Sequence, residues 1–344
     1  MSAKFVAEEL PIRLAHRLQK MEMMPFQFMS IPRLTSIYER YYLGFDEMRR
    51  RTSINGLVEN AEYCTFLSNL LDSHNNVVSD LLIGVMESVQ KGAVTDPQLI
   101  DEFVKSMLLS RISRRVLAEQ HISLSNAFGR GITNNTKDQS YVGEVFLQCN
   151  ARDIIDEASK TVGESVGVEN LPTIILEGDL DTVFPYVRNH VEFIVCEVLR
   201  NSVEACLRTG SQEPITVSVS STKENVFIRI SDRGGGISPD VVDTLWTFVK
   251  PYNSDNFTPQ ALERLWPVQE AHHAKRSPSA SSLTQLSHRA SGIGTGIGLP
   301  LARIYAEYWG GAIEVHSLEG FGCDSLIRIS RLGTMLENLN LDRV

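Results

Sequence analysis

Residues 292–300 read Gly-Ile-Gly-Thr-Gly-Ile-Gly-Leu-Pro, which places four glycines at alternate positions directly before a predicted helix. Proline is favoured in the first turn of a helix, and Gly310-Gly311 marks its expected end. The free N–H groups of the glycine run and the positive helix N-terminus together suit an anion. A flexible linker is the alternative interpretation, and the helix that follows at once makes it the weaker one. The stretch therefore predicts that a triphosphate binds here.

A second motif, Glu197-Val-Leu-Arg-Asn201, lies in a segment with helical apolar spacing that we expect to span 190–207. Side chains four residues apart on a helix lie one turn apart on the same face. A carboxylate near a triphosphate can accept the proton of an attacking hydroxyl or water. An amide oxygen suits the Mg²⁺ ion that bridges phosphate oxygens. In isolation this motif would be a solvated helix face, so its weight comes from the order of the three motifs.

The third motif, Asp232-Arg-Gly-Gly-Gly236, follows an alternating strand pattern at Val226, Ile228 and Ile230. Asp232 is then expected at a strand end, where its carboxylate could accept a hydrogen bond from the exocyclic amine of adenine. The glycines let the base pack close to the backbone. Alone, the motif is equally consistent with an ordinary turn. Together, the three motifs predict an ATP site in the C-terminal half of the chain.

Other nucleotide-binding patterns do not fit the sequence. In a G-x-G-x-x-G register the third glycine would fall on Ile297 or Leu299, and no G-x-x-x-x-G-K-[ST] stretch is present. The V-A-I-K, H-R-D and D-F-G signatures of eukaryotic-type protein kinases are also missing. These comparisons exclude the Rossmann, P-loop and eukaryotic-type kinase interpretations.

The pattern along the chain predicts an α+β protein with two domains. Helical spacing dominates from about Pro11 to Phe128, which predicts a four-helix-type bundle. A polar stretch at 129–140 then precedes mixed strands and helices, so we place a bundle domain at 1–143 and an α/β sandwich with a mixed sheet at 144–344. The expected strands include 173–176, 215–219 and a closing hairpin within 312–330. A long polar segment predicts a lid loop at about 253–298.

Composition excludes several classes of protein. The chain has 344 residues, of which 42% are hydrophobic and 22% are charged, as expected for two ordinary core-bearing domains. No apolar run reaches the roughly 18 to 20 residues of a membrane span. A net charge of -9 argues against nucleic acid as a partner. The first residues show no clear targeting presequence.

Two histidines of the bundle, His74 and His121, are expected to lie in helices and to make structural hydrogen bonds, and we assign them no chemistry. The five cysteines are odd in number and widely spaced, which predicts reduced, mostly buried thiols.

The motifs resemble the N, G1 and G2 boxes of the histidine-kinase-like ATPase fold. Within that fold the chain resembles the mitochondrial protein kinases that phosphorylate pyruvate dehydrogenase or branched-chain 2-oxoacid dehydrogenase. The distinguishing stretches are Tyr305-Ala-Glu-Tyr-Trp-Gly-Gly311, Gly320-Phe-Gly-Cys-Asp324, His74-Asn-Asn-Val-Val78 and Ser110-Arg-Ile-Ser-Arg-Arg-Val-Leu-Ala-Glu-Gln-His121. Bacterial two-component kinases share the ATPase fold but lack these bundle stretches.

The resemblance implies a helical regulatory and docking domain joined to a kinase domain. The kinase would transfer the γ-phosphoryl group of ATP, with Mg²⁺, to a serine on the E1α subunit of a 2-oxoacid dehydrogenase and so inactivate it, with pyruvate dehydrogenase as the expected substrate. It further implies docking on the lipoyl domain of E2, a homodimer or a heterodimer with a paralogue, and a place in the mitochondrial matrix.

The resemblance also implies roles for single residues. Glu197 would be the general base, Asn201 the Mg²⁺ ligand and Asp232 the adenine acceptor. The implied nucleotide contacts are Glu197, Arg200, Asn201, Glu204, Asp232, Gly234, Gly236, Gly294, Thr295, Gly296, Ile297, Gly298, Leu299 and Cys323.

Three positions depart from the family's pattern. Phe193 stands where a histidine precedes the base by one turn, Glu204 where an arginine is usual, and Cys323 where a threonine is usual. Desolvation of Glu197 by the Phe193 ring is expected to alter catalysis. The departures leave open a second hypothesis, in which the chain is a catalytically weak regulatory or binding subunit of the same family.

Overall fold

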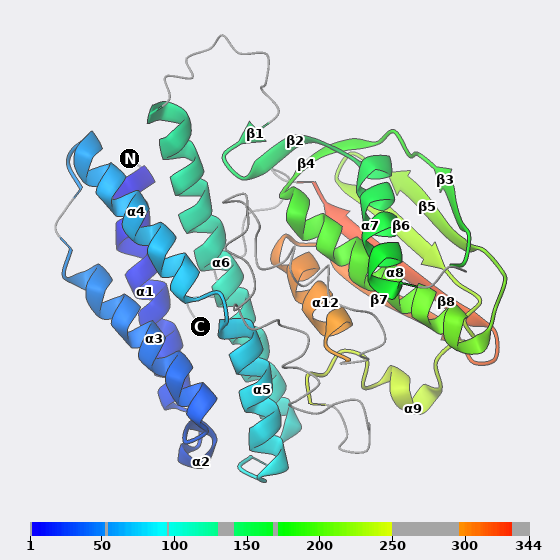
Figure 1. Ribbon diagram of the computed structural model, residues 1–344, viewed down its shortest axis with the longest axis horizontal. Helices are drawn as coiled ribbons and strands as arrows, with labels where there is room; N and C mark the ends of the chain where they lie inside the picture. The colour runs from blue at the N-terminus through cyan, green and yellow to red at the C-terminus, as the bar shows by residue number, and fades with distance from the viewer. Residues whose placement is uncertain are drawn as a thin grey trace. The chain divides into compact units, whose positions relative to one another are not determined.

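The computed structural model describes residues 2–51, 54–94, 96–129, 141–167, 171–249 and 296–331. The chain forms two compact units that divide between Phe146 and Leu147. The first unit is helical, and Figure 1 labels its helices. They are α1 (Ser2–Glu22), α2 (Phe26–Met29), α3 (Pro32–Arg49), α4 (Leu57–Ser73), α5 (Val77–Gln90) and α6 (Pro97–Gly129).

The helical unit is held together by apolar faces that meet along the helices. α1 packs on α3 and α6, α3 packs on α5, and α4 packs on α6. Its core includes Leu14 of α1, Leu34 of α3, Leu67 of α4 and Val104 of α6, all at most 1% exposed. The predicted helical N-terminal region is therefore confirmed.

The first helix begins earlier than the sequence predicted. α1 starts at Ser2 and continues through Pro11, although an internal proline removes one backbone hydrogen bond. Val6, Leu10, Leu14 and Leu18 are all buried at a spacing of four residues. This continuous apolar stripe offsets the cost of the proline, because packing supplies most of the stability of a helix in a folded protein.

The start of α6 follows the capping chemistry that the sequence indicates. The Asp96 carboxylate accepts hydrogen bonds from the backbone N–H groups of Gln98 at 3.0 Å and Leu99 at 3.5 Å. Pro97 occupies the first helical position, where its missing N–H costs nothing.

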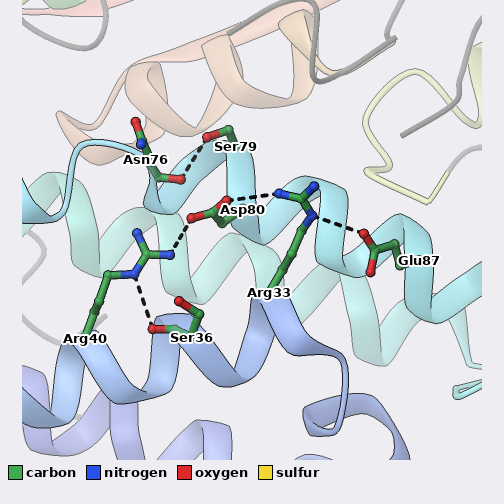
Figure 2. Close-up of polar contacts among 7 residues, drawn as sticks. All are labelled: Arg33, Ser36, Arg40, Asn76, Ser79, Asp80 and Glu87. Atoms are coloured by element: carbon green, nitrogen blue, oxygen red, sulfur yellow. Dashed lines mark hydrogen bonds and ion pairs between the residues drawn. The ribbon is translucent and has the colours of Figure 1, made fainter. Parts of the chain in front are cut away.

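A network of ion pairs joins α3 to α5 (Figure 2). Arg33 lies 3.4 Å from Asp80 and 3.1 Å from Glu87, and Arg40 makes a short contact with Asp80. The Nε atom of Arg40 also donates to the carbonyl of Ser36. These side chains are partly buried, and Asp80 pairs with two arginines while Arg33 pairs with two carboxylates. The network therefore fixes the register of α3 against α5 better than separate surface pairs would.

The second unit contains a five-stranded mixed sheet of order β3-β5-β6-β8-β7. β3 pairs parallel with β5, and the other pairs are antiparallel. Its elements are α7 (Ala151–Val166), β3 (Ile174–Gly178), β4 (Val183–Tyr186), α8 (Arg188–Thr209), β5 (Ile215–Ser221), β6 (Asn225–Ser231), α9 (Pro239–Val242), α12 (Gly298–Tyr308), β7 (Ala312–Leu318) and β8 (Gly322–Ser330).

Helices α8 and α12 pack on one face of this sheet, and α7 packs on α8 (Figure 1). Val219, Ile228, Ile327 and Ile313 are paired across four neighbouring strands, and each is at most 3% exposed. This row alternates with more polar residues on each strand, as expected for a sheet with one buried face. The α+β class with a mixed sheet is confirmed.

Three short strands were not predicted. β1 (Tyr141–Val142), β2 (Val145–Asn150) and β4 form a second sheet of order β1-β2-β4. β1 has two residues and β2 has no regular alternation of buried and exposed positions, so neither carries the period-2 signal that identifies a strand. The predicted lid at about 253–298 lies outside the described residues except for 296–298.

The two bundle histidines make structural contacts. His121 lies within α6, where its ring nitrogens contact Ser2 Oγ at 3.1 Å and Cys64 Sγ at 3.7 Å. His74 is not inside a helix as predicted, since it forms the C-cap of α4, with Nε2 3.4 Å from the carbonyl oxygen of Arg40. His74 also lines a small cavity with Tyr41 and Arg114. In the part of the chain that the structure describes, no helix is both long and apolar enough to cross a bilayer.

We expect His74 to make the protein sensitive to mild acid. Burial, reinforced by the nearby Arg114 charge, lowers the pKa of His74 from 6.5 to about 3. The unfolded chain therefore takes up this proton as pH falls below 6.5 while the folded chain does not, so stability falls between pH 6.5 and about 3. The loss is up to about 1.4 kcal/mol per pH unit.

Thermal melting of the wild type and of His74→Gln at pH 7.5 and 5.5 measures this effect. Between pH 7.5 and 5.5 the melting temperature of the wild type should fall further than that of the variant, because glutamine does not titrate. Equal losses in the two proteins would contradict the assignment.

Candidate active site

Helix α8 carries Glu197 and Asn201 one turn apart, as predicted. The Asn201 side chain is exposed, and its Nδ2 atom donates to the backbone carbonyl of Glu197 at 2.7 Å. That hydrogen bond occupies the amide nitrogen and turns Oδ1 away from the helix carbonyl. An exposed amide oxygen of this kind is a suitable ligand for Mg²⁺ together with phosphate oxygens. Asn201 therefore fits a magnesium ion.

The Glu197 side chain is buried, whereas Asn201, one turn away on the same helix, is exposed. Glu197 is 0% exposed, and its Oε1 atom lies 3.8 Å from Nε of Arg200. Arg200 is itself only 2% exposed. The Arg200 guanidinium therefore points into the protein, where it donates to Ser165 of α7, and the Asn201 amide points toward solvent.

Asp232 lies directly after β6, at the strand end where the sequence placed it. It is 3% exposed, and its Oδ1 atom accepts from the backbone N–H groups of Gly234 at 2.9 Å and Cys323 at 3.3 Å. Its own N–H donates to the Cys323 carbonyl at 2.9 Å. These bonds fix the carboxylate and engage Oδ1, so Oδ2 is the atom suited to accept from a ligand amine.

The glycines after Asp232 allow very close packing of the backbone. A Cβ atom on Gly234 would lie 2.5 Å from Cβ of Ala205, one turn beyond Asn201 on α8. Gly236 has a φ of +71°, and a Cβ there would lie 2.2 Å from the carbonyl oxygen of Leu318. The Asp232 motif therefore crosses α8 beside the turn that carries Asn201.

Cys323 and Glu204 flank this crossing. The Cys323 thiol donates to Ser317 Oγ at 3.4 Å, and burial raises the pKa of this thiol, which stays protonated at neutral pH. Glu204 is half-buried on α8, one turn beyond Arg200. The sequence contained no signal for the Ser317 contact, since this serine is close to Cys323 only through the β7–β8 pairing.

Helix α12 brings the end of the glycine run toward the same part of α8. Near its C-terminal end the Tyr305 ring packs on Phe193 at 5.4 Å, and Trp309 donates to His190 at 3.0 Å. The two helices therefore run in opposite directions. Gly298 precedes Tyr305 by seven residues, or about 10 Å along the axis. The N-terminus of α12 is thus expected level with the turn that carries Glu197 and Asn201.

The other residues of the glycine run can be placed only in part. Gly296 has a φ of +64°, Ile297 is buried as the N-cap of α12, and Gly298 and Leu299 form its first turn. Gly294 and Thr295 lie outside the described residues. The first turn of a helix presents N–H groups that have no partner within the helix, which suits a phosphate.

Phe193 lies one turn before Glu197, as the sequence indicated, and is fully buried against Tyr305. Helical spacing places this ring on the same side of α8 as the Glu197 side chain. Among the described residues, no group of three or more His, Cys, Asp and Glu side chains could hold a metal ion.

Comparison with known proteins finds a matching family model for each of two stretches of the chain. Residues 1–146 match the family of mitochondrial branched-chain α-ketoacid dehydrogenase kinase. Residues 187–332, which span α8 to β8, match the histidine kinase-, DNA gyrase B- and HSP90-like ATPases.

Full-length relatives agree with these matches. The chain is 28% identical to mitochondrial pyruvate dehydrogenase (acetyl-transferring) kinase 2 of Saccharomyces cerevisiae, over 100% of this chain and 79% of the relative. It is 27% identical to the mitochondrial pyruvate dehydrogenase kinase of Arabidopsis thaliana, over 98% of this chain and 87% of that protein. It is 26% identical to human isozyme 1, over 97% and 73% of the two chains.

Proposed function

We propose that the chain is a kinase of the mitochondrial pyruvate dehydrogenase and branched-chain 2-oxoacid dehydrogenase kinase family, as its matches support, and that it phosphorylates a serine on the E1α subunit of pyruvate dehydrogenase. It is an ATP-dependent protein kinase. The observation that carries the proposal is the convergence on α8 of Asn201, Glu197 and the Asp232 turn.

Each group of the site has a role in this reaction. Glu197 accepts the proton of the serine hydroxyl as its oxygen attacks the γ-phosphorus, and ADP leaves with the electrons of the broken bond. Asp232 accepts from the adenine amine, and the N–H groups at the start of α12 hold the phosphates. Asn201 would hold a Mg²⁺ ion, which when bound neutralises charge on the phosphate oxygens. The remaining nucleotide contacts, with the exception of Arg200, are those predicted from the sequence.

We further propose the partners that the family resemblance implies. The helical unit would dock on an E2 lipoyl domain and regulate the kinase unit, and two chains, identical or paralogous, would form a dimer. The relatives are named as mitochondrial kinases, and on this basis we propose that the chain acts in the mitochondrial matrix.

The test is phosphoryl transfer from labelled ATP and Mg²⁺ to purified E1 of the two dehydrogenases in separate reactions. We expect phosphoserine on E1α of pyruvate dehydrogenase, mapped by mass spectrometry, with parallel loss of dehydrogenase activity. Preferential transfer to the branched-chain E1 would contradict the choice of substrate. ATP binding without transfer to either E1 would contradict the kinase proposal and support the regulatory subunit.

A further inference from the structure

Arg200 and Glu197 form a buried ion pair inside the proposed site. They are separated by one turn of α8, and the 3.8 Å between Nε of Arg200 and Oε1 of Glu197 is within ion-pair range. The two side chains are 2% and 0% exposed. Burying a charged group costs free energy unless an opposite charge compensates it. The Arg200 guanidinium therefore offsets part of the cost of burying the Glu197 carboxylate.

The guanidinium is also held from the other side, by α7. Nη1 of Arg200 donates to Ser165 Oγ at 2.6 Å. The Ser165 hydroxyl donates its own proton to the Val162 carbonyl at 2.8 Å, which directs an oxygen lone pair toward Arg200. Ser165 is therefore an oriented acceptor, and α7 fixes the guanidinium that faces Glu197.

The fork of arginine is required for this arrangement. Nε lies within ion-pair distance of the Glu197 carboxylate on α8 while Nη1 donates to Ser165 on α7, so one rigid planar group interacts with two helices at once. A lysine could supply the charge from its single ammonium group but could not match both contacts.

We propose that Arg200 is a positioning residue, which acts through Glu197, and that Ser165 positions Arg200 in turn. This inference rests on the proposed kinase function and assigns Arg200 a role other than the nucleotide contact expected from the sequence. The Arg200 guanidinium, held by α7, orients the Glu197 carboxylate, and this carboxylate must meet the hydroxyl of the substrate serine on E1α. Misplacing a catalytic group by about 1 Å can cost about 10²-fold in rate.

The test compares Arg200→Gln, Arg200→Lys and Ser165→Ala with the wild type, measuring kcat, KM for ATP and the dissociation constant for ATP. Arg200→Gln should lower kcat by about 10- to 100-fold, with ATP affinity within about threefold of the wild type. Arg200→Lys should recover part of the loss, because it restores the charge. Ser165→Ala should cost about threefold in kcat.

A matched control is Arg188→Gln, which removes a partly exposed ion pair with Glu192 at the start of the same helix. It should leave kcat unchanged. The double variant Arg200→Gln with Ser165→Ala should be no slower than Arg200→Gln alone, because the serine acts through the arginine. Stoichiometric ATP binding counts the folded sites in each preparation, so kcat is expressed per folded molecule.

The outcomes separate this inference from the kinase proposal. A wild type that transfers no phosphate to E1 would defeat the proposed function. A wild type that transfers normally, with variants that weaken ATP binding tenfold or more at unchanged kcat, would show that Arg200 contacts the nucleotide. Additive losses in the double variant would show that Ser165 does not act through Arg200.

Discussion

Replacing Glu197 by glutamine is expected to lower the rate of phosphoryl transfer by about 10³-fold, within the range that a general base contributes. Glutamine has nearly the same shape and keeps an oxygen beside Arg200, but it cannot take the proton of the serine hydroxyl. ATP affinity should change far less than the rate, because adenine and phosphates are held by other groups. Single-turnover transfer from labelled ATP to E1, together with calorimetric titration of ATP, measures the two quantities separately.

A control for this variant is Glu192→Gln on the same helix, where the carboxylate is partly exposed and paired with Arg188. It should transfer at the rate of the wild type. A Glu197→Gln protein that keeps more than about a tenth of the wild-type rate would show that another group removes the proton.

Replacing Asp232 by asparagine should weaken ATP binding by about 100-fold, since a hydrogen bond to a charged group contributes roughly 1.5–3 kcal/mol. The asparagine oxygen can still accept from Gly234 and Cys323, so the turn should keep its shape. The amide nitrogen would then take the place of Oδ2 and face the adenine amine, donor against donor. Calorimetric titration of ATP gives the affinity.

A comparison of ATP with GTP tests whether Asp232 recognises the base, because guanine carries a carbonyl where adenine carries its amine. The wild type should prefer ATP strongly over GTP, and Asp232→Asn should narrow or reverse that preference. Asp240→Asn, at an exposed position of α9, is the matched control and should bind ATP normally. An Asp232→Asn protein that loses ATP and GTP affinity equally would show that Asp232 supports the fold of the turn and does not read the base.

Much of the fold could be predicted because its strongest elements carry simple periodic signals. The alternation at Val226, Ile228 and Ile230 became β6, and the helical spacing around Glu197 became α8. The elements that escaped prediction lack such signals. β1 is too short to have a period, and α1 continues through Pro11 only because its apolar stripe packs on α3 and α6.

The same distinction applies to the site. Motif order placed Asn201 on α8 and Asp232 at a strand end, and the structure adds that the Gly234 turn crosses α8 beside Ala205. The contact between Arg200 and Ser165 could not be predicted, because it joins residues 35 positions apart on two helices. A serine near the end of a helix has no pattern that identifies its partner before the helices are packed.

The most direct test of the account is a crystal structure of the protein with Mg²⁺ and a non-hydrolysable ATP analogue. We expect the adenine amine to hydrogen-bond to Asp232 and the metal ion to bind Oδ1 of Asn201. The phosphates should then lie at the N-terminus of α12, and the γ-phosphate on the side of α8 that carries Glu197. A nucleotide bound away from Asp232 and Asn201 would contradict the central claim that one site on α8 holds ATP, magnesium and the catalytic carboxylate.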